Sequence, residues 1–199
     1  MRLIFLLLIA LLTTTCIHLP LYNYTHNPAI AAPERTITVR IDRNFSLDDK
    51  TAIDDALMAW NYALNNYIVF KVISTDFNMQ PSEINDGSLL IMKIDHNSYL
   101  IPVSDNPGAD VLGFIPNLGS KHMYIIRDRI VDELQLKEIV MHEIGHFFYV
   151  KHTDDAKSLM YGQLFIAYQQ CIDKYTIEKV AKIEGLDINK LNYCSYDDE

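Results

Sequence analysis

One stretch, MHEIGHFFYVKH at residues 141–152, limits how this chain can fold more than any other. His142 and His146 are four residues apart, so on a helix their rings project from one face, one turn apart. His152 follows six residues later, and a continuous helix would carry its ring about 9 Å further along the axis. The three histidines can meet only if the helix ends soon after His146 and the chain turns back.

A metal ion would explain why histidines occur in such an apolar setting. The apolar residues on both sides predict a buried helix, and buried imidazoles need polar partners. Nitrogens of His142 and His146 can bind one Zn²⁺ at about 2.0–2.1 Å, and a catalytic zinc takes a third protein ligand and leaves one position open. His152 is the natural third ligand, and Glu143 is placed to act as general base toward a water molecule there. The pattern thus predicts one catalytic Zn²⁺.

The sequence HEIGHFFYVKH, followed by SLMY, resembles the metzincin zinc metallopeptidases, most closely their matrixin (matrix metalloproteinase-like) branch. That family carries H-E-x-x-H-x-x-G-x-x-H and then a turn with a methionine beneath the metal. Met160 takes the place of that methionine, and Tyr161 beside it is expected to pack or to shape the substrate pocket. The resemblance implies an endopeptidase that cleaves a protein or peptide substrate. It also implies an extended substrate paired with a strand edge, which we expect at 88–95.

The chain departs from the family pattern in three ways. Tyr149 stands at the family glycine, where the backbone usually turns with positive φ, and a bulky side chain there costs of order 1 kcal/mol. We expect no inhibitory segment of the matrixin kind. His122 takes the place of one structural-zinc ligand, but Ser98 and Gly113 occupy the places of others, so no structural zinc is predicted. The segment SDNPGAD (104–110) favours a solvated turn over a calcium site.

Three other interpretations of the histidine motif remain. In the first, an ordinary helix carries solvated or core histidines without a metal. In the second, a gluzincin-like peptidase binds zinc through the two helical histidines and a downstream glutamate such as Glu178. In the third, an exported zinc-binding or adhesion module binds the metal without turnover. Glu143 argues against the third, because a structural zinc prefers four closed protein ligands.

Residue periodicity along the body predicts a mixed α+β domain. Strand patterns occur in four segments: 37–42, 68–73, 88–95 and 122–128. Helix patterns occur in three: about 46–66, from Asp132 through the histidine motif, and 176–184 before Gly185. The Pro- and Gly-rich segment 105–120 should be mostly loop. Together with the resemblance, this order of elements predicts a zincin-like fold. A twisted mixed sheet of four or five strands would pack on two long helices, and a C-terminal helix would follow. One edge strand of the sheet would bind the substrate.

The N-terminal residues differ from the rest. One positive charge and the apolar run LIFLLLIALL (3–12) are typical of a secretory signal and fall short of the roughly 20 residues of a spanning helix. The sequence leaves three fates for this segment. It could be lipidated at Cys16, cleaved near AIAA (29–32), or retained as a membrane anchor. Each predicts an exported protein, secreted or attached to a membrane. We expect residues 1–32 to be signal or anchor and tether, and 33–199 to be the catalytic domain.

Charge limits the binding partners of the chain, and cysteine content indicates where it acts. The net charge of −9 argues against a nucleic-acid partner, and we expect a monomer. Without Cys16, the two remaining cysteines, Cys171 and Cys194, are an even pair that could form a disulfide, as suits an exported protein. Two buried thiols are the alternative.

Overall fold

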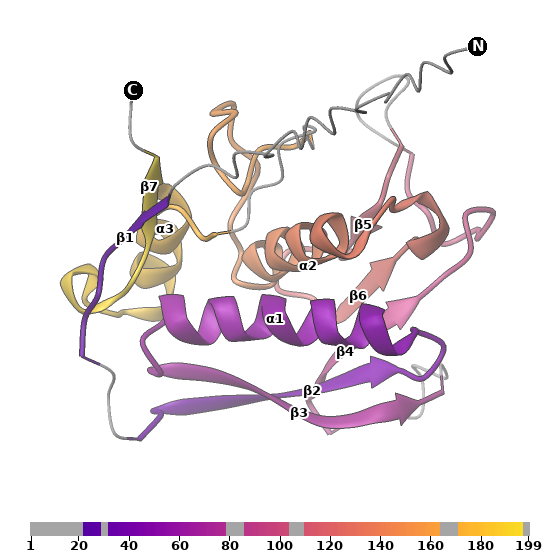
Figure 1. Ribbon diagram of the computed structural model, residues 1–199, viewed down its shortest axis with the longest axis horizontal. Coiled ribbons are helices and arrows are strands. Elements are labelled where there is room, and N and C mark those ends of the chain that lie inside the picture. The colour runs from indigo at the N-terminus through magenta and orange to yellow at the C-terminus, as the bar shows by residue number, and fades with distance from the viewer. Residues whose placement is uncertain (1–21, 29–31, 79–85, 104–109, 164–170, 197–199) are drawn as a thin grey trace, which may run out of the picture.

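The structure is a computed structural model of the 199-residue chain, and it describes residues 22–28, 32–78, 86–103, 110–163 and 171–196. Two long helices, α1 and α2, run side by side along a sheet, and a third helix, α3, lies beyond one end of α1 (Figure 1). The α+β class predicted from the sequence is confirmed.

The main sheet has five strands in the order β3-β2-β4-β6-β5. Its members are β2 (Arg35–Asp42), β3 (Ile68–Phe77), β4 (Leu89–Lys93), β5 (Gly113–Phe114) and β6 (His122–Ile125). Neighbouring strands are parallel except for β5, which runs antiparallel to β6, so the sheet is mixed. All four predicted strands are present.

The prediction that residues 88–95 provide the open edge of the sheet is wrong. Strand β4 pairs with β2 on one side, where Val39 faces Leu89, and with β6 on the other, where Leu90 faces His122. Its first four residues are all buried, as expected for a central parallel strand covered on both faces. The edge strands are β3 and β5, and β5 lies inside the segment predicted to be mostly loop.

Helix α1 (Leu47–Ala63) begins and packs as its sequence predicts. Ser46 accepts a hydrogen bond from the Asp49 backbone while the Asp49 carboxylate accepts one from the Ser46 backbone, which forms a capping box. The indole N–H of Trp60 donates to the carbonyl of Met141 at 3.0 Å, which joins α1 to α2 within the core. The fully buried Trp60 thus fixes the histidine-bearing helix against α1.

The other two helices also begin at side-chain caps. Asp132 accepts from the Gln135 backbone at 2.8 Å at the start of α2 (Glu133–Phe147). Asp173 caps α3 (Lys174–Glu184), which therefore starts two residues earlier than predicted and ends at Gly185 with φ 72°. Two 3₁₀ turns, Arg127–Arg129 and Ile188–Lys190, follow β6 and α3.

The segment around residues 22–28, expected to be part of a tether, packs on the C-terminal region. Strand β1 (Tyr22–Tyr24) pairs antiparallel with β7 (Cys194–Tyr196). The Asn27 backbone donates to the side chain of buried Asn192 at 2.8 Å. These contacts place residues before position 32 within the folded body, and the boundary at 32/33 stays a prediction.

Cys171 and Cys194 form the disulfide that the even cysteine pair suggested. A disulfide suggests an extracytoplasmic protein. In the described ranges, no helix has the length and apolar character needed to cross a membrane. The apolar run, Cys16 and most of the AIAA segment lie outside the described residues.

Candidate metal centre

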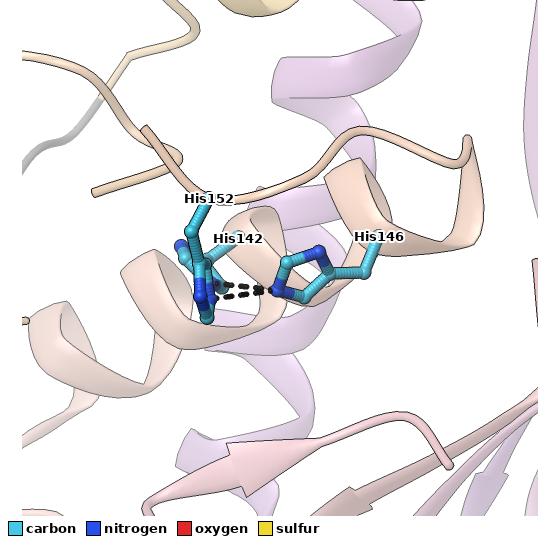
Figure 2. A group of neighbouring side chains, drawn as sticks. All are labelled: His142, His146 and His152. Carbon is cyan, nitrogen blue, oxygen red and sulfur yellow. Dashed lines mark hydrogen bonds between the residues drawn. The ribbon is translucent and has the colours of Figure 1, made fainter. Parts of the chain in front are cut away.

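The side chains of His142, His146 and His152 converge on one point (Figure 2). The Nε2 atom of His142 lies 3.1 Å from those of His146 and His152, and the latter two are 3.0 Å apart. Imidazole nitrogens around a tetrahedral zinc, each at 2.0–2.1 Å, would be about 3.3–3.4 Å apart. The three nitrogens are therefore spaced almost as ligands of a single ion.

Backbone carbonyls fix which nitrogen of each helical histidine faces the centre. The Nδ1 atom of His142 lies 2.7 Å from the carbonyl oxygen of Leu159, and Nδ1 of His146 lies 2.7 Å from that of Val150. A carbonyl can only accept, so Nδ1 carries the proton and Nε2 presents a lone pair. These two lone pairs cannot hydrogen-bond to each other, and a cation is the partner that fits them.

Burial keeps the two helical histidines neutral. His142 is only 9% exposed, and burial lowers its pKa to about 3, with the nearby His146 lowering it further. Burial likewise lowers the pKa of His146 to about 4. Metal ligands must be neutral imidazoles, so both residues are in the binding form at neutral pH.

A tight turn after α2 brings His152 back to the helix. The backbone N–H of Tyr149 donates to His146 and that of Val150 donates to Gly145, at 2.9 and 3.0 Å, which is a Schellman motif. Tyr149 has φ 64°, so the left-handed conformation expected at the family glycine is present with tyrosine. The chain thus doubles back after Val150, as the motif spacing requires.

Met160 lies beneath the helix that carries the histidines. It is fully buried, and a Cβ built on Gly145 would lie 2.2 Å from its sulfur atom. Only a glycine at position 145 allows this close packing. The turn is closed by hydrogen bonds from Tyr161 to Ser158 and from Thr153 to Met160, both 3.0 Å.

Asp173 supports this turn, although its role could not be seen in the motif itself. Its Oδ2 atom accepts hydrogen bonds from the Leu159 backbone, the Ser158 hydroxyl and the Thr176 hydroxyl, at 2.8, 3.2 and 2.8 Å. Because the carbonyl oxygen of Leu159 accepts from the His142 ring, the buried carboxylate orients a candidate metal ligand through this one residue. The helix-start pattern Asp-x-x-Thr at 173–176 was the available sequence signal.

Glu143 lines the same cleft as the histidines, and the residue is 5% exposed. Burial raises its pKa to about 8, while the backbone N–H of Ile115 donates to it and favours the charged form. Its Oε2 atom has no hydrogen-bond partner among the described residues. A divalent cation nearby would lower this pKa and stabilise the carboxylate.

The centre opens into a cleft of about 730 Å³. Its walls come from α2, from β5 with the residues around it, and from the segment after Met160. The lining residues are Pro102, Val103, Asp110, Val111, Leu112, Gly113, Phe114, Ile115, Gln135, Ile139, His142, Glu143, His146, His152, Tyr161, Gly162 and Gln163. Tyr161 therefore borders the cleft, and edge strand β5 runs along it.

Other candidate ligands lie elsewhere. Glu178 is on α3, half exposed and 3.8 Å from Lys174, and it does not line the cleft. A cluster of at least three His, Cys, Asp or Glu side chains could bind one metal ion. Within the described ranges, the three histidines form such a cluster. His122 belongs to no such cluster within those ranges, and most of segment 104–110 lies outside them.

Comparisons with known proteins found no protein-family model that matches this chain and no curated protein that matches its sequence. The α+β fold and the convergent histidines are therefore the properties from which a function has to be inferred.

Proposed function

We propose that the protein is a zinc-dependent endopeptidase of the metzincin type, most similar to the matrixin branch. The observation that carries the proposal is the convergence of three imidazole rings beside a buried, partly unpartnered glutamate in the lining of an open cleft. Three protein ligands leave a fourth position for water or substrate, which separates a catalytic zinc site from a structural one.

The protein side of the reaction rests on His142, His146, His152 and Glu143. When bound, a zinc ion supplies a Lewis acid that polarises the scissile carbonyl and makes water more acidic. The Glu143 Oε2 atom, which no described group occupies, accepts the proton of the attacking water and then donates it to the departing amine. The Ile115 N–H holds the carboxyl group in place during both transfers.

Strand β5 offers the binding edge for an extended peptide. Its pairing with β6 leaves its other edge toward the cleft, and a peptide there would add a strand through backbone hydrogen bonds. Tyr161 and Gln163 also line the cleft and would contact the substrate side chains. We propose a monomer that acts outside the cytoplasm on protein or peptide substrates and binds no nucleic acid. It is either secreted or attached to a membrane by its N-terminal segment.

The test of the proposed function is cleavage of an unfolded protein such as casein by the zinc-loaded full chain. Glu143→Gln should retain stoichiometric zinc and lose activity by about 10²–10⁴-fold, because the general base is removed while the ligands remain. Glu133→Gln, on the exposed start of the same helix, is the matched control and should stay active. A wild type that binds zinc but cleaves no substrate would favour the inert zinc-binding module instead.

Zinc affinity distinguishes the two possible ligand sets. His152→Ala should weaken zinc binding strongly, and Glu178→Ala should leave it unchanged, because Glu178 lies on α3 outside the cleft. The opposite result would support a gluzincin-like site.

A further inference from the structure

The ring of Tyr149 packs directly over the backbone of Gly119. A Cβ built on Gly119 would lie only 2.1 Å from Cζ and 2.3 Å from the hydroxyl oxygen of Tyr149. Gly119 has φ 79° and Tyr149 has φ 64°, so both residues hold a left-handed backbone. A tyrosine at this position costs about 1 kcal/mol in backbone strain, and the residue is 58% exposed rather than part of the core.

Gly119 is also tied to the end of helix α2. Its N–H donates to the carbonyl oxygen of His146 at 3.0 Å, and the same oxygen accepts the N–H of Tyr149. The ring contact and this hydrogen bond attach residues 113–119, here called the wall segment, to the turn that carries the ligands. Figure 2 shows this turn leaving the helix after His146 and returning with His152.

The wall segment carries groups that the site needs at its other end. Gly113 and Phe114 form the edge strand along the cleft, and the Ile115 N–H donates to the Glu143 carboxylate. The segment is held by β6 at one end and by the Gly119 contact at the other. Any displacement of Gly119 would therefore act on both the ligand turn and the glutamate.

We propose that Tyr149 is a positioning residue, whose ring fastens the wall segment to the metal-ligand turn through Gly119. In this role it sets the relative position of His152 and of the Ile115 N–H. The ring thereby offsets the backbone cost of a tyrosine in the left-handed region. The proposal rests on the proposed zinc site, and only its kinetic arm depends on peptidase activity.

A double-mutant cycle on the full chain tests the coupling of the two residues. The variants are Gly119→Ala, Tyr149→Asn and the double variant, with zinc affinity from a competing chelator as the main readout. Gly119→Ala alone drives a methyl group into the ring and should weaken zinc binding about 10–100-fold, the usual cost of disturbing a ligand's supporting residues. In the Tyr149→Asn background, where asparagine tolerates the left-handed backbone, only the strain of alanine at φ 79° remains, so the same change should cost at least about 5-fold less than in wild type.

Equal costs of Gly119→Ala in both backgrounds would overturn the proposal, because the ring would then play no part. Tyr149→Phe keeps the ring and should match wild type in zinc affinity and in the visible spectrum of the Co²⁺ form. If Gly119→Ala does not fold, the zinc affinities of Tyr149→Asn and Tyr149→Phe decide. Weaker binding by Tyr149→Asn alone supports the proposal, and equal affinities contradict it. Loss of amide protection at Ile115 in hydrogen exchange for Tyr149→Asn alone supports the proposal, and unchanged protection contradicts it.

The kinetic arm separates this proposal from the proposed function. In an active enzyme, Tyr149→Asn should lower kcat more than it raises KM, because Glu143 loses its fixed position. If wild type binds zinc and cleaves nothing, the proposed peptidase fails, while the zinc-affinity cycle still tests Tyr149.

Discussion

The Leu159 N–H donates to the Asp173 carboxylate at 2.8 Å, and the Leu159 carbonyl accepts from the His142 ring at 2.7 Å. One peptide segment thus connects the start of the last helix to a ligand of the candidate metal centre. The buried carboxylate accepts hydrogen bonds from three groups through one oxygen atom, so it holds this segment in a single position.

Replacement of Asp173 by asparagine should weaken zinc binding about 10–100-fold, because the amide presents a donor where an acceptor is required. Competition with a chromophoric chelator measures the change. Asp187→Asn, at the exposed cap of a 3₁₀ turn, is the control and should bind zinc as wild type does. Equal affinity of the two variants would show that the Asp173 contacts do not orient His142.

Replacement of Gly145 by alanine should destabilise the protein, although alanine is the better helix former by about 1 kcal/mol. The new methyl group would lie 2.2 Å from the buried sulfur of Met160, and overpacking of this kind costs about 1–3 kcal/mol. Urea unfolding measures the free energy. In a Met160→Ala background the same substitution should be neutral or stabilising, and a loss of equal size there would contradict the packing argument.

Reduction of the Cys171–Cys194 disulfide should lower the free energy of unfolding by about 3 kcal/mol, the value expected for a separation of 23 residues. Thermal unfolding with and without a reductant measures the effect. Cys16→Ser is the control, because it removes the third cysteine and leaves the pair intact. A native oxidised chain with more than one titratable thiol would rule out the disulfide.

The buried ion pair of Asp49 with Arg127, 2.5 Å apart, should make stability depend on pH in acid. Burial raises the pKa of Asp49, but hydrogen bonds from Arg127 and Ser46 outweigh burial and hold it below its ordinary value. The unfolded carboxyl titrates near pH 3.9, so the pair contributes fully above that pH and is lost as pH falls through the lower folded pKa.

Asp49→Asn should therefore cost about 1–3 kcal/mol at pH 7, and the difference from wild type should shrink below about pH 4. Urea unfolding at several pH values measures this dependence. A difference that is as large at pH 3 as at pH 7 would contradict an ionised, paired Asp49 in the fold.

Local spacing was enough to predict the helices and the three histidines that meet. The four- and six-residue intervals require a helix followed by a reversal, and both are present because the Schellman turn at Tyr149 supplies the reversal. Helix caps at Ser46 and Asp132 were equally visible, since a cap depends on neighbours within three residues.

Pairing between distant segments was not visible in the sequence. The order of the sheet places β4 in its centre; its continuous apolar run, Leu89–Met92, is typical of a strand covered on both faces, but it does not indicate which strands pair with it. Strand β5 has two residues, too few for an alternating pattern. The contacts of Asn27 with Asn192 and of Tyr149 with Gly119 join residues that lie far apart in the chain.

The most direct test of the account is the crystal structure of the zinc-loaded full chain, with anomalous data collected at the zinc edge. We predict one peak about 2.0–2.1 Å from the Nε2 atoms of His142, His146 and His152, with a fourth position not filled by protein. A zinc ion bound elsewhere, or at this helix with the His152 ring turned away from it, would contradict the proposed centre.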